Sequence, residues 1–223
     1  PNLFKPQPYH PVDDFSHLGI WGHGHFVLAV PATSPWKSVA DVVAAARASQ
    51  LPLNYGTAGI ATPGHLFVSQ WSHAAGVTLN HVPFKSGADL VPAGVRGDVP
   101  LLTDGTFFLL PQMAAGRLRA LAVFAPRRLP VLPDTPTMAE AGFAGIDHPV
   151  WNGLFTPAGL PAAVSARLQS ALERVTQQAD FLRWNAEANR IVEWRNGEQM
   201  RAQVAREFAF WGREIQRAGI STS

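Results

Sequence analysis

The fold is decided by the stretch Asn54-Tyr55-Gly56-Thr57-Ala58-Gly59-Ile60-Ala61-Thr62-Pro63-Gly64-His65. Apolar side chains fall on every second residue from Leu51 to Tyr55, and this alternation predicts a strand. Thr62 is a good N-cap, and Pro63 suits the first helical position because its missing N–H costs nothing there. We therefore expect a helix that begins after Thr62 and ends at Gly76, a typical C-terminal stop.

The residues between that strand and that helix, Thr57 to Thr62, are small. Gly56 and Gly59 allow positive φ and leave backbone N–H groups uncovered. A helix N-terminus with free N–H groups and the positive end of the helix dipole is a ready site for a carboxylate or a phosphate. An ordinary turn between a strand and a helix has the same composition, so the stretch alone leaves both interpretations open.

Short apolar strands alternate with helices on both sides of this stretch. Strands are expected at residues 26–30, 78–84, 99–103 and 118–124, and helices at 39–49, 87–95 and 106–115. The first of these helices begins with a capping box, Ser38-Val39-Ala40-Asp41. Pro92 is expected to weaken the second unless it falls in the first turn, and Pro111 to kink or restart the third. This alternation predicts βαβ units and a parallel sheet.

Ligands on such sheets bind beyond the carboxyl ends of the strands. The candidate ligand-binding residues there are Thr57, Ala58, Gly59, Ile60, Thr62, Lys85, Ser86 and Asp104. Lys85 can pair with a distal carboxylate, although a solvated lysine in a turn is the commoner case. Asp104 can accept from an ammonium or hydroxyl group of a ligand, or it can cap the turn before Gly105.

The last third of the chain is expected to be mostly helical. Residues 125–149 are rich in Pro and Gly, with a short helix expected at 137–141 and a strand at 150–155. A helix from Pro161 carries Val164, Leu168, Leu172 and Val175 on one face. Asn196 and Gln199 cap the last helix, which ends at Gly219. Trp151 is a further candidate ligand-binding residue, as an apolar wall, although core packing also explains it.

Composition excludes several classes of protein. The chain has 223 residues, a formal net charge of +2 and no Cys, with Lys and Arg scattered along it. Scattered charge does not predict a nucleic-acid partner, and no apolar run is long enough for membrane insertion. Cys-based catalysis is ruled out, and no nucleophile elbow, His-Glu-x-x-His or Walker A motif is present. We therefore expect no enzyme activity and no cofactor.

A metal site built on histidines is the one exception that the sequence raises. His23 and His25 point to the same side if residues 22–30 form one extended segment, and a His-x-His pair can bind zinc. His17, His65 and His81 add to the pool. No Asp or Glu stands at a telling spacing, so we favour a metal-free pair. His65 either packs beside the start of its helix or helps to orient the preceding loop.

A series of motifs runs along the whole chain. In order, they are Asn2-Leu3-Phe4-Lys5, Pro8-Tyr9-His10-Pro11-Val12-Asp13-Asp14-Phe15, Asn54-Tyr55-Gly56-Thr57-Ala58-Gly59, Pro63-Gly64-His65, His81-Val82-Pro83-Phe84-Lys85, Ala115-Gly116-Arg117-Leu118-Arg119-Ala120-Leu121-Ala122, Leu132-Pro133-Asp134-Thr135-Pro136-Thr137, Ala139-Glu140-Ala141-Gly142, Trp151-Asn152-Gly153-Leu154-Phe155-Thr156-Pro157-Ala158-Gly159, Trp211-Gly212 and Ala218-Gly219-Ile220. Their order resembles that of the substrate-binding receptors of tripartite tricarboxylate transporters, the Bug-type proteins. Pro92, Pro100 and Gly22-His23-Gly24-His25 depart from that pattern.

The resemblance implies an α/β fold of the periplasmic-binding-protein type (type II), with a parallel-rich sheet and flanking helices in its complete lobe. It places residues 1–30 and 150–223 in the first lobe and residues 31–149 in the second. In the family a strand and a glycine-rich loop upstream of the Pro-Tyr-x-Pro segment supply half of the ligand clamp, so the first lobe is expected to be incomplete here. The other half matches Thr57 to Thr62.

The function that the resemblance implies is reception of a small carboxylate in the periplasm, without catalysis. The ligand would be a di- or tricarboxylate, an amino acid or an aromatic acid, and the partners would be the membrane subunits of the transporter. Two alternatives stay open. One is a periplasmic sensor that docks on a membrane kinase, and the other is a metal-dependent hydrolase that uses the histidines.

Overall fold

The computed structural model describes residues 2–3 and 6–221 and divides into two compact units. The terminal unit combines Pro1–Gly24 with Val150–Ser223, and the central unit is His25–Pro149. Phe4 and Lys5, which belong to the first motif of the resemblance, lie outside the described residues. Each unit has its own sheet.

The central unit is built on a five-stranded sheet. Its strands are β2 (Phe26–Pro31), β3 (Leu53–Thr57), β4 (Leu79–Pro83), β5 (Leu101–Gly105) and β6 (Leu118–Phe124), in the order β4-β3-β5-β2-β6. β3 pairs in parallel with both β4 and β5, whereas β2 is antiparallel to β5 and to β6. The sheet is therefore mixed, with four strands running one way and β2 inserted in the opposite direction.

The inserted strand also moves the domain boundary. Residues up to 30 were expected in the first lobe, whereas the two compact units divide between Gly24 and His25. The physical reason is the hydrogen bonding of β2, which pairs along its length with β5 and β6 of the central unit.

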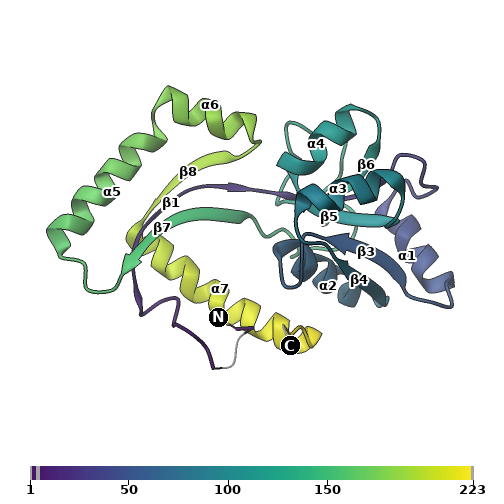
Figure 1. Ribbon diagram of the computed structural model, residues 1–223, viewed down its shortest axis with the longest axis horizontal. Helices are drawn as coiled ribbons and strands as arrows, with labels where there is room; N and C mark the ends of the chain where they lie inside the picture. Colours follow the sequence, from purple (N-terminus) through teal and green to yellow (C-terminus); the bar gives the residue numbers. More distant parts are fainter. Residues whose placement is uncertain (1, 4–5, 222–223) are drawn as a thin grey trace. The chain divides into compact units, whose positions relative to one another are not determined.

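The helices of the central unit flank this sheet, as Figure 1 shows. They are α1 (Val39–Ala48), α2 (Pro63–Ala75), α3 (Gly87–Arg96) and α4 (Thr106–Ala114). The predicted capping box of α1 is present, with the Ser38 hydroxyl accepting from the Asp41 N–H. One core cluster joins α3 and α4 to the sheet, and its fully buried members include Val27, Leu90, Leu102, Leu109 and Val123.

Of the helices expected in the central unit, two contain a proline and one, at residues 137–141, does not form. α3 continues through Pro92 and α4 through Pro111. Burial of Leu90 and Leu109 in the shared core compensates for the hydrogen bond that each proline removes. Residues 137–141 form turns rather than a helix, although the Glu140 N–H still bonds to the Thr137 hydroxyl as a helix cap would.

The terminal unit contains a three-stranded antiparallel sheet in the order β7-β1-β8. Its strands are β1 (Phe15–Gly24), β7 (Val150–Pro157) and β8 (Ile191–Asn196), and its helices are α5 (Ala162–Thr176), α6 (Ala179–Glu187) and α7 (Gly197–Ala218). The expectation of a purely helical segment after Pro161 was wrong at β8. The Asn196–Gln199 capping box and the stop at Gly219 were predicted correctly.

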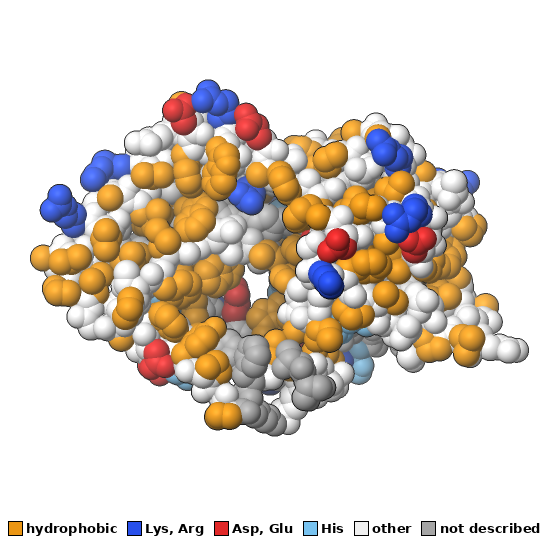
Figure 2. Space-filling view, in the orientation of Figure 1, with side chains coloured by type: hydrophobic (Ala, Val, Ile, Leu, Met, Phe, Trp, Pro, Cys, Tyr) orange, Lys and Arg blue, Asp and Glu red, His pale blue; other side chains and the backbone are white. Residues whose placement is uncertain are grey.

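Helices α5 and α6 leave apolar side chains on the surface of the terminal unit. Val164 and Leu168 on α5 are 44% and 40% exposed, and Leu182 and Trp184 on α6 are 43% and 53% exposed. Figure 2 shows hydrophobic side chains over both helices. Within the described residues, no helix has the length and apolar character needed to cross a bilayer.

Candidate carboxylate-binding site

Three of the predicted loops lie at one edge of the central sheet. β3, β4 and β5 are parallel neighbours, with Tyr55 opposite both His81 and Leu101. The carboxyl ends of the three strands therefore meet at the same edge, and the loops after Thr57, Pro83 and Gly105 begin there. All the candidate residues except Trp151 are brought together by this register.

Two threonine hydroxyl groups make hydrogen bonds within the loop from Thr57 to Thr62. The Thr57 hydroxyl donates to the Gly59 carbonyl at 2.9 Å, and the Thr62 hydroxyl donates to the same oxygen at 2.8 Å. Gly59 has φ 137° and Ala61 has φ 58°. The first value is suited to glycine, and the second is unusual for alanine, so the loop holds a conformation that its side chains alone would not favour.

The N-terminus of α2, which follows this loop, has no side-chain cap. Thr62 occupies the N-cap position, but its hydroxyl is committed to Gly59 and accepts from no helix N–H. Pro63 has no N–H, so the first N–H groups of the helix belong to Gly64 and His65. Uncapped N–H groups at the positive end of a helix dipole favour an anion. Ile60, at the tip of the loop, is 49% exposed.

Asp104 precedes Gly105, the last residue of β5, and is almost fully buried. Its Oδ1 accepts from the Gly105 N–H at 2.7 Å, and its Oδ2 has no hydrogen-bond partner among the described residues. Burial raises the pKa of the Asp104 carboxyl, and the hydrogen bond from Gly105 opposes this shift. One oxygen of Asp104 thus caps the turn, which was one of the two alternatives from the sequence, and the other oxygen is left without a partner among the described residues.

The remaining candidate residues are Lys85, Ser86 and Trp151, and each makes its own set of contacts. Ser86 caps α3, since its hydroxyl accepts from the Asp89 N–H and donates to the Asp89 carboxylate at 2.8 Å. Lys85 is exposed. Trp151 belongs to the terminal unit, where it packs against the Ile20–Met200–Val204 cluster and donates Nε1–H to Glu207 at 2.8 Å.

Two residues of this edge were missed as site residues, His65 and His81. Their rings stack with centroids 3.7 Å apart. His65 Nδ1 accepts from the Ala61 N–H at 3.0 Å, and His81 Nε2 lies 2.7 Å from the Thr57 hydroxyl. Of the two sequence alternatives for His65, the structure thus shows contact with the loop. The sequence signal was the appearance of both histidines in the quoted motifs.

His23 and His25 do not share one strand. β1 ends at Gly24, β2 begins at Phe26, and the two histidines fall in different units. His23 Nδ1 lies 3.5 Å from a carboxylate oxygen of Glu193, and His25 Nδ1 lies 3.3 Å from the Phe124 carbonyl. Among the described residues, no group of three His, Cys, Asp or Glu side chains is placed to hold a metal ion.

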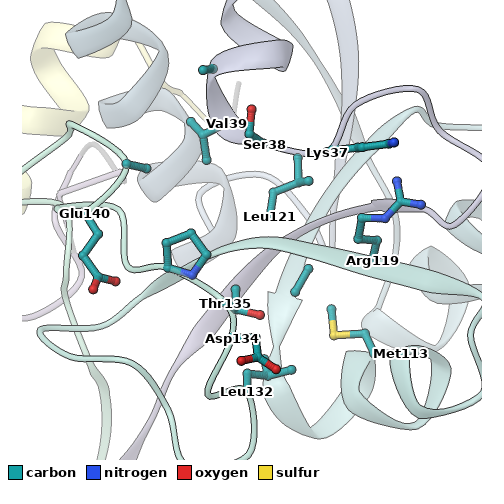
Figure 3. Close-up of a pocket in the computed structure, with 14 residues that line it drawn as sticks. Lys37, Ser38, Val39, Met113, Arg119, Leu121, Leu132, Asp134, Thr135 and Glu140 are labelled. Carbon is teal, nitrogen blue, oxygen red and sulfur yellow. The ribbon is translucent and has the colours of Figure 1, made fainter.

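A pocket of about 600 Å³ lies at the opposite edge of the central sheet (Figure 3). It is lined by the start of β6 and the N-terminus of α1, where β2 ends against Leu118. Arg119 in its wall donates to the carbonyls of Ala32, Ser34 and Trp36, and Glu140 pairs with Arg128 at 2.9 Å. These two side chains hold neighbouring loops, and we refer to the cavity as the structural pocket.

The α/β architecture is shared with solved periplasmic binding proteins, so the chain has a periplasmic-binding-protein fold. The chain belongs to the family described as tripartite tricarboxylate transporter family receptor, whose model matches residues 1–220. This is a receptor family, in agreement with the expectation that the chain is not an enzyme.

Solved structures and a curated relative support this membership. The chain is similar to the periplasmic binding protein BugD, with 26% identity and a TM-score of 0.87 over 99% of this chain and 75% of that one. It is equally similar to an R. palustris protein solved with adipate, with 27% identity and a TM-score of 0.87 over 98% and 73% of the two chains. A protein encoded in the tcbD-tcbE intergenic region of a Pseudomonas species is 33% identical over 81% of this chain and 54% of its own length. The chain thus spans about half the length of curated relatives that it matches.

Proposed function

We propose that this chain is the ligand-receiving part of a periplasmic receptor for small carboxylates, which delivers its ligand to the membrane subunits of a tripartite tricarboxylate-type transporter. The observation that carries the proposal is the uncapped N-terminus of α2 behind the Thr57–Thr62 loop. The similar R. palustris protein was solved with adipate, which supports a dicarboxylate as the first ligand to test.

The proposed role of the loop is to surround one carboxylate group with backbone N–H donors. Thr57 and Thr62 hold the Gly59 carbonyl, and this keeps the loop folded back on the start of α2. Such pre-organisation lowers the entropic cost of binding, because the donors are in place before the ligand arrives. Asp104 Oδ2, which is buried and unpartnered, is proposed to select among ligands by the group that they carry opposite it.

The proposal is tested by adding adipate to the isotope-labelled chain and following backbone amide shifts by NMR. We expect saturable shifts at residues 58–65. Shift mapping detects even millimolar affinity, so weak binding by this chain is still measured. Absence of shifts at this loop up to about 100 mM adipate, or shifts confined to another surface, would contradict the proposal.

A matched pair of glycine substitutions distinguishes damage to the binding site from a general loss of stability through backbone strain. Gly59→Val strains a positive-φ position inside the loop, and Gly116→Val strains one with φ 67° and open space around it. Valine disfavours both backbone conformations, so both variants lose stability. Only Gly59→Val should weaken adipate binding, by about tenfold or more, which corresponds to at least about 1.4 kcal/mol. Equal losses of adipate affinity in the two variants would show that the loop does not bind the ligand.

A further inference from the structure

His65 and His81 form a stacked pair against the Thr57–Thr62 loop. The ring centroids are 3.7 Å apart with an interplanar angle of 21°. His65 lies in the first turn of α2, and His81 lies in the middle of β4. Tyr55 of β3 flanks His81 at 5.0 Å, so the pair is packed between three elements of the central unit.

Each ring makes one hydrogen bond to the loop. His65 Nδ1 accepts from the N–H of Ala61, the residue with the unusual φ of 58°. Accepting at Nδ1 requires a neutral ring that carries its proton on Nε2. This hydrogen bond stabilises Ala61 in the left-handed region, a conformation that costs a non-glycine residue free energy.

His81 acts on the other end of the loop. The Thr57 hydroxyl donates its one hydrogen to the Gly59 carbonyl, so it receives the hydrogen bond of 2.7 Å from His81 Nε2–H. Thr57 is fully buried, and its hydroxyl also lies 3.3 Å from the Gly59 N–H. His81 therefore orients the hydroxyl that folds the loop.

Both rings are held uncharged by their surroundings. Burial lowers the pKa of His65 below its ordinary value of 6.5. Burial and the neighbouring His65 lower the pKa of His81 to about 4. The titratable side chain that faces the pair from β3 is Tyr55, and burial raises its pKa so that it stays neutral. No carboxylate contributes to either histidine shift.

We propose that His65 and His81 are a positioning pair, which holds the carboxylate-binding loop in its receiving conformation while His65 is neutral and accepts from Ala61. This inference rests on the proposed function, because it assumes that the loop receives the ligand. A protonated His65 cannot accept from Ala61, and two cationic rings at this separation repel each other. Ligand affinity is then lost on acidification, as the pH falls through the lowered pKa of His65, and the rings act through their hydrogen bonds to the loop.

The experiment compares substitutions that keep or remove the single hydrogen bond of His65. His65→Asn retains an acceptor near the Nδ1 position and cannot be protonated, whereas His65→Leu retains bulk and removes the acceptor. The control is His73→Leu, a substitution of the same type in the last turn of the same helix, at an exposed residue. Each variant differs from the wild-type chain only by its one substitution.

The first measurement needs no ligand. Hydrogen exchange of the Ala61 amide at about pH 7 should be at least about tenfold faster in His65→Leu than in the wild type, and it should be restored in His65→Asn. Side-chain ¹⁵N spectra of the wild type should show both rings as Nε2–H tautomers. An Ala61 amide that exchanges equally in wild type and His65→Leu would overturn the proposal.

The second measurement is adipate affinity from about pH 5 to pH 8. The wild type should lose affinity on acidification, His65→Leu should be weak at every pH, and His65→Asn should bind with a reduced pH dependence. A wild-type pH profile in His65→Leu would contradict the inference. If wild type itself binds no adipate, the receptor proposal fails instead, and the exchange measurement still decides whether the pair positions the loop.

Discussion

Gly87 lies so close to Asp104 that a Cβ atom at position 87 would be 2.5 Å from the carboxylate Oδ2. The same Cβ would lie 3.1 Å from the ring of Phe108. Gly87 is the first residue of α3 and its φ is not positive, so its backbone conformation is open to other residues. The glycine is thus required for space beside Asp104 rather than for its flexibility.

The first prediction follows from this contact. Gly87→Ala should lower the free energy of unfolding by about 1–2 kcal/mol, because Asp104 and Phe108 must shift. Alanine is otherwise the better helix residue, so a net loss identifies the clash. Urea denaturation measures the effect. In a double-mutant cycle, Asp104→Ala should relieve much of it, and strictly additive losses would show that the two positions do not interact.

The second prediction concerns the charge of Asp104. Its folded-state pKa is raised by burial, so the folded chain binds this proton more tightly than the unfolded chain does. Stability therefore falls as the pH rises from 3.8 through the folded pKa, and the ionised carboxylate is a cost at neutral pH. Asp104→Asn should raise the free energy of unfolding at about pH 7, by the roughly 1 kcal/mol typical of one substitution. The gain should vanish below about pH 3, where the group is protonated in both states.

Asp104→Asn should also reduce the selectivity among ligands. Calorimetry with adipate, malate and aspartate compares ligands that carry no donor, a hydroxyl and an ammonium group between their carboxylates. An ionised Asp104 accepts best from an ammonium, so Asp104→Asn should weaken aspartate most and adipate least. An equal change for all three ligands would show that Oδ2 does not face the ligand.

The third prediction is a loss of stability in acid that originates at His81. Its pKa falls from 6.5 in the unfolded chain to about 4 in the folded chain. For a base with a lowered pKa, the contribution to stability is complete above pH 6.5 and is lost as the pH falls towards 4. Because His81 is partly exposed, the loss should be no more than about 2–3 kcal/mol.

Chemical denaturation of wild type and His81→Gln at several pH values from about 4 to 8 measures this loss. Glutamine keeps an N–H donor for the Thr57 hydroxyl and does not titrate in this range. The variant should show a flatter dependence of stability on pH. Parallel curves for the two proteins would assign the acid sensitivity to other groups.

Much of the central unit was predictable from local sequence. The alternation of strands and helices, the Ser38 capping box and the stop at Gly76 all depend on neighbouring residues, and they are present. The direction of β2 was not predictable, because its apolar run fits either a parallel or an antiparallel neighbour. The six-residue strand β8 was missed because so short a segment between two helices carries too little signal.

The candidate site was predictable only in part. The loops after Thr57, Phe84 and Asp104 follow from the rule that parallel strands share a carboxyl edge. The role of His65 and His81 depends instead on the β3–β4 register and on which ring nitrogen carries the proton. Neither property has a sequence signature, so tertiary contacts alone reveal the stacked pair.

The last prediction separates the structural pocket from the binding site. Arg119 donates to three backbone carbonyls, those of Ala32, Ser34 and Trp36, at 2.7–3.1 Å. Hydrogen bonds to a charged group are worth about 1.5–3 kcal/mol, and a buried carbonyl left without a partner adds to the cost. Arg119→Met, which keeps much of the apolar stem, should therefore lower the free energy of unfolding by about 2 kcal/mol or more.

The matched control is Arg96→Met in the same unit. Arg96 pairs with Asp98 on the surface, and its side chain is 62% exposed, so its loss should change stability by less than about 0.5 kcal/mol. Because Arg119 lies at the opposite edge of the sheet from the Thr57–Thr62 loop, its substitution should leave adipate-induced shifts at residues 58–65 unchanged under native conditions. Loss of those shifts in a folded Arg119→Met variant would place the pocket, rather than the loop, at the centre of ligand binding.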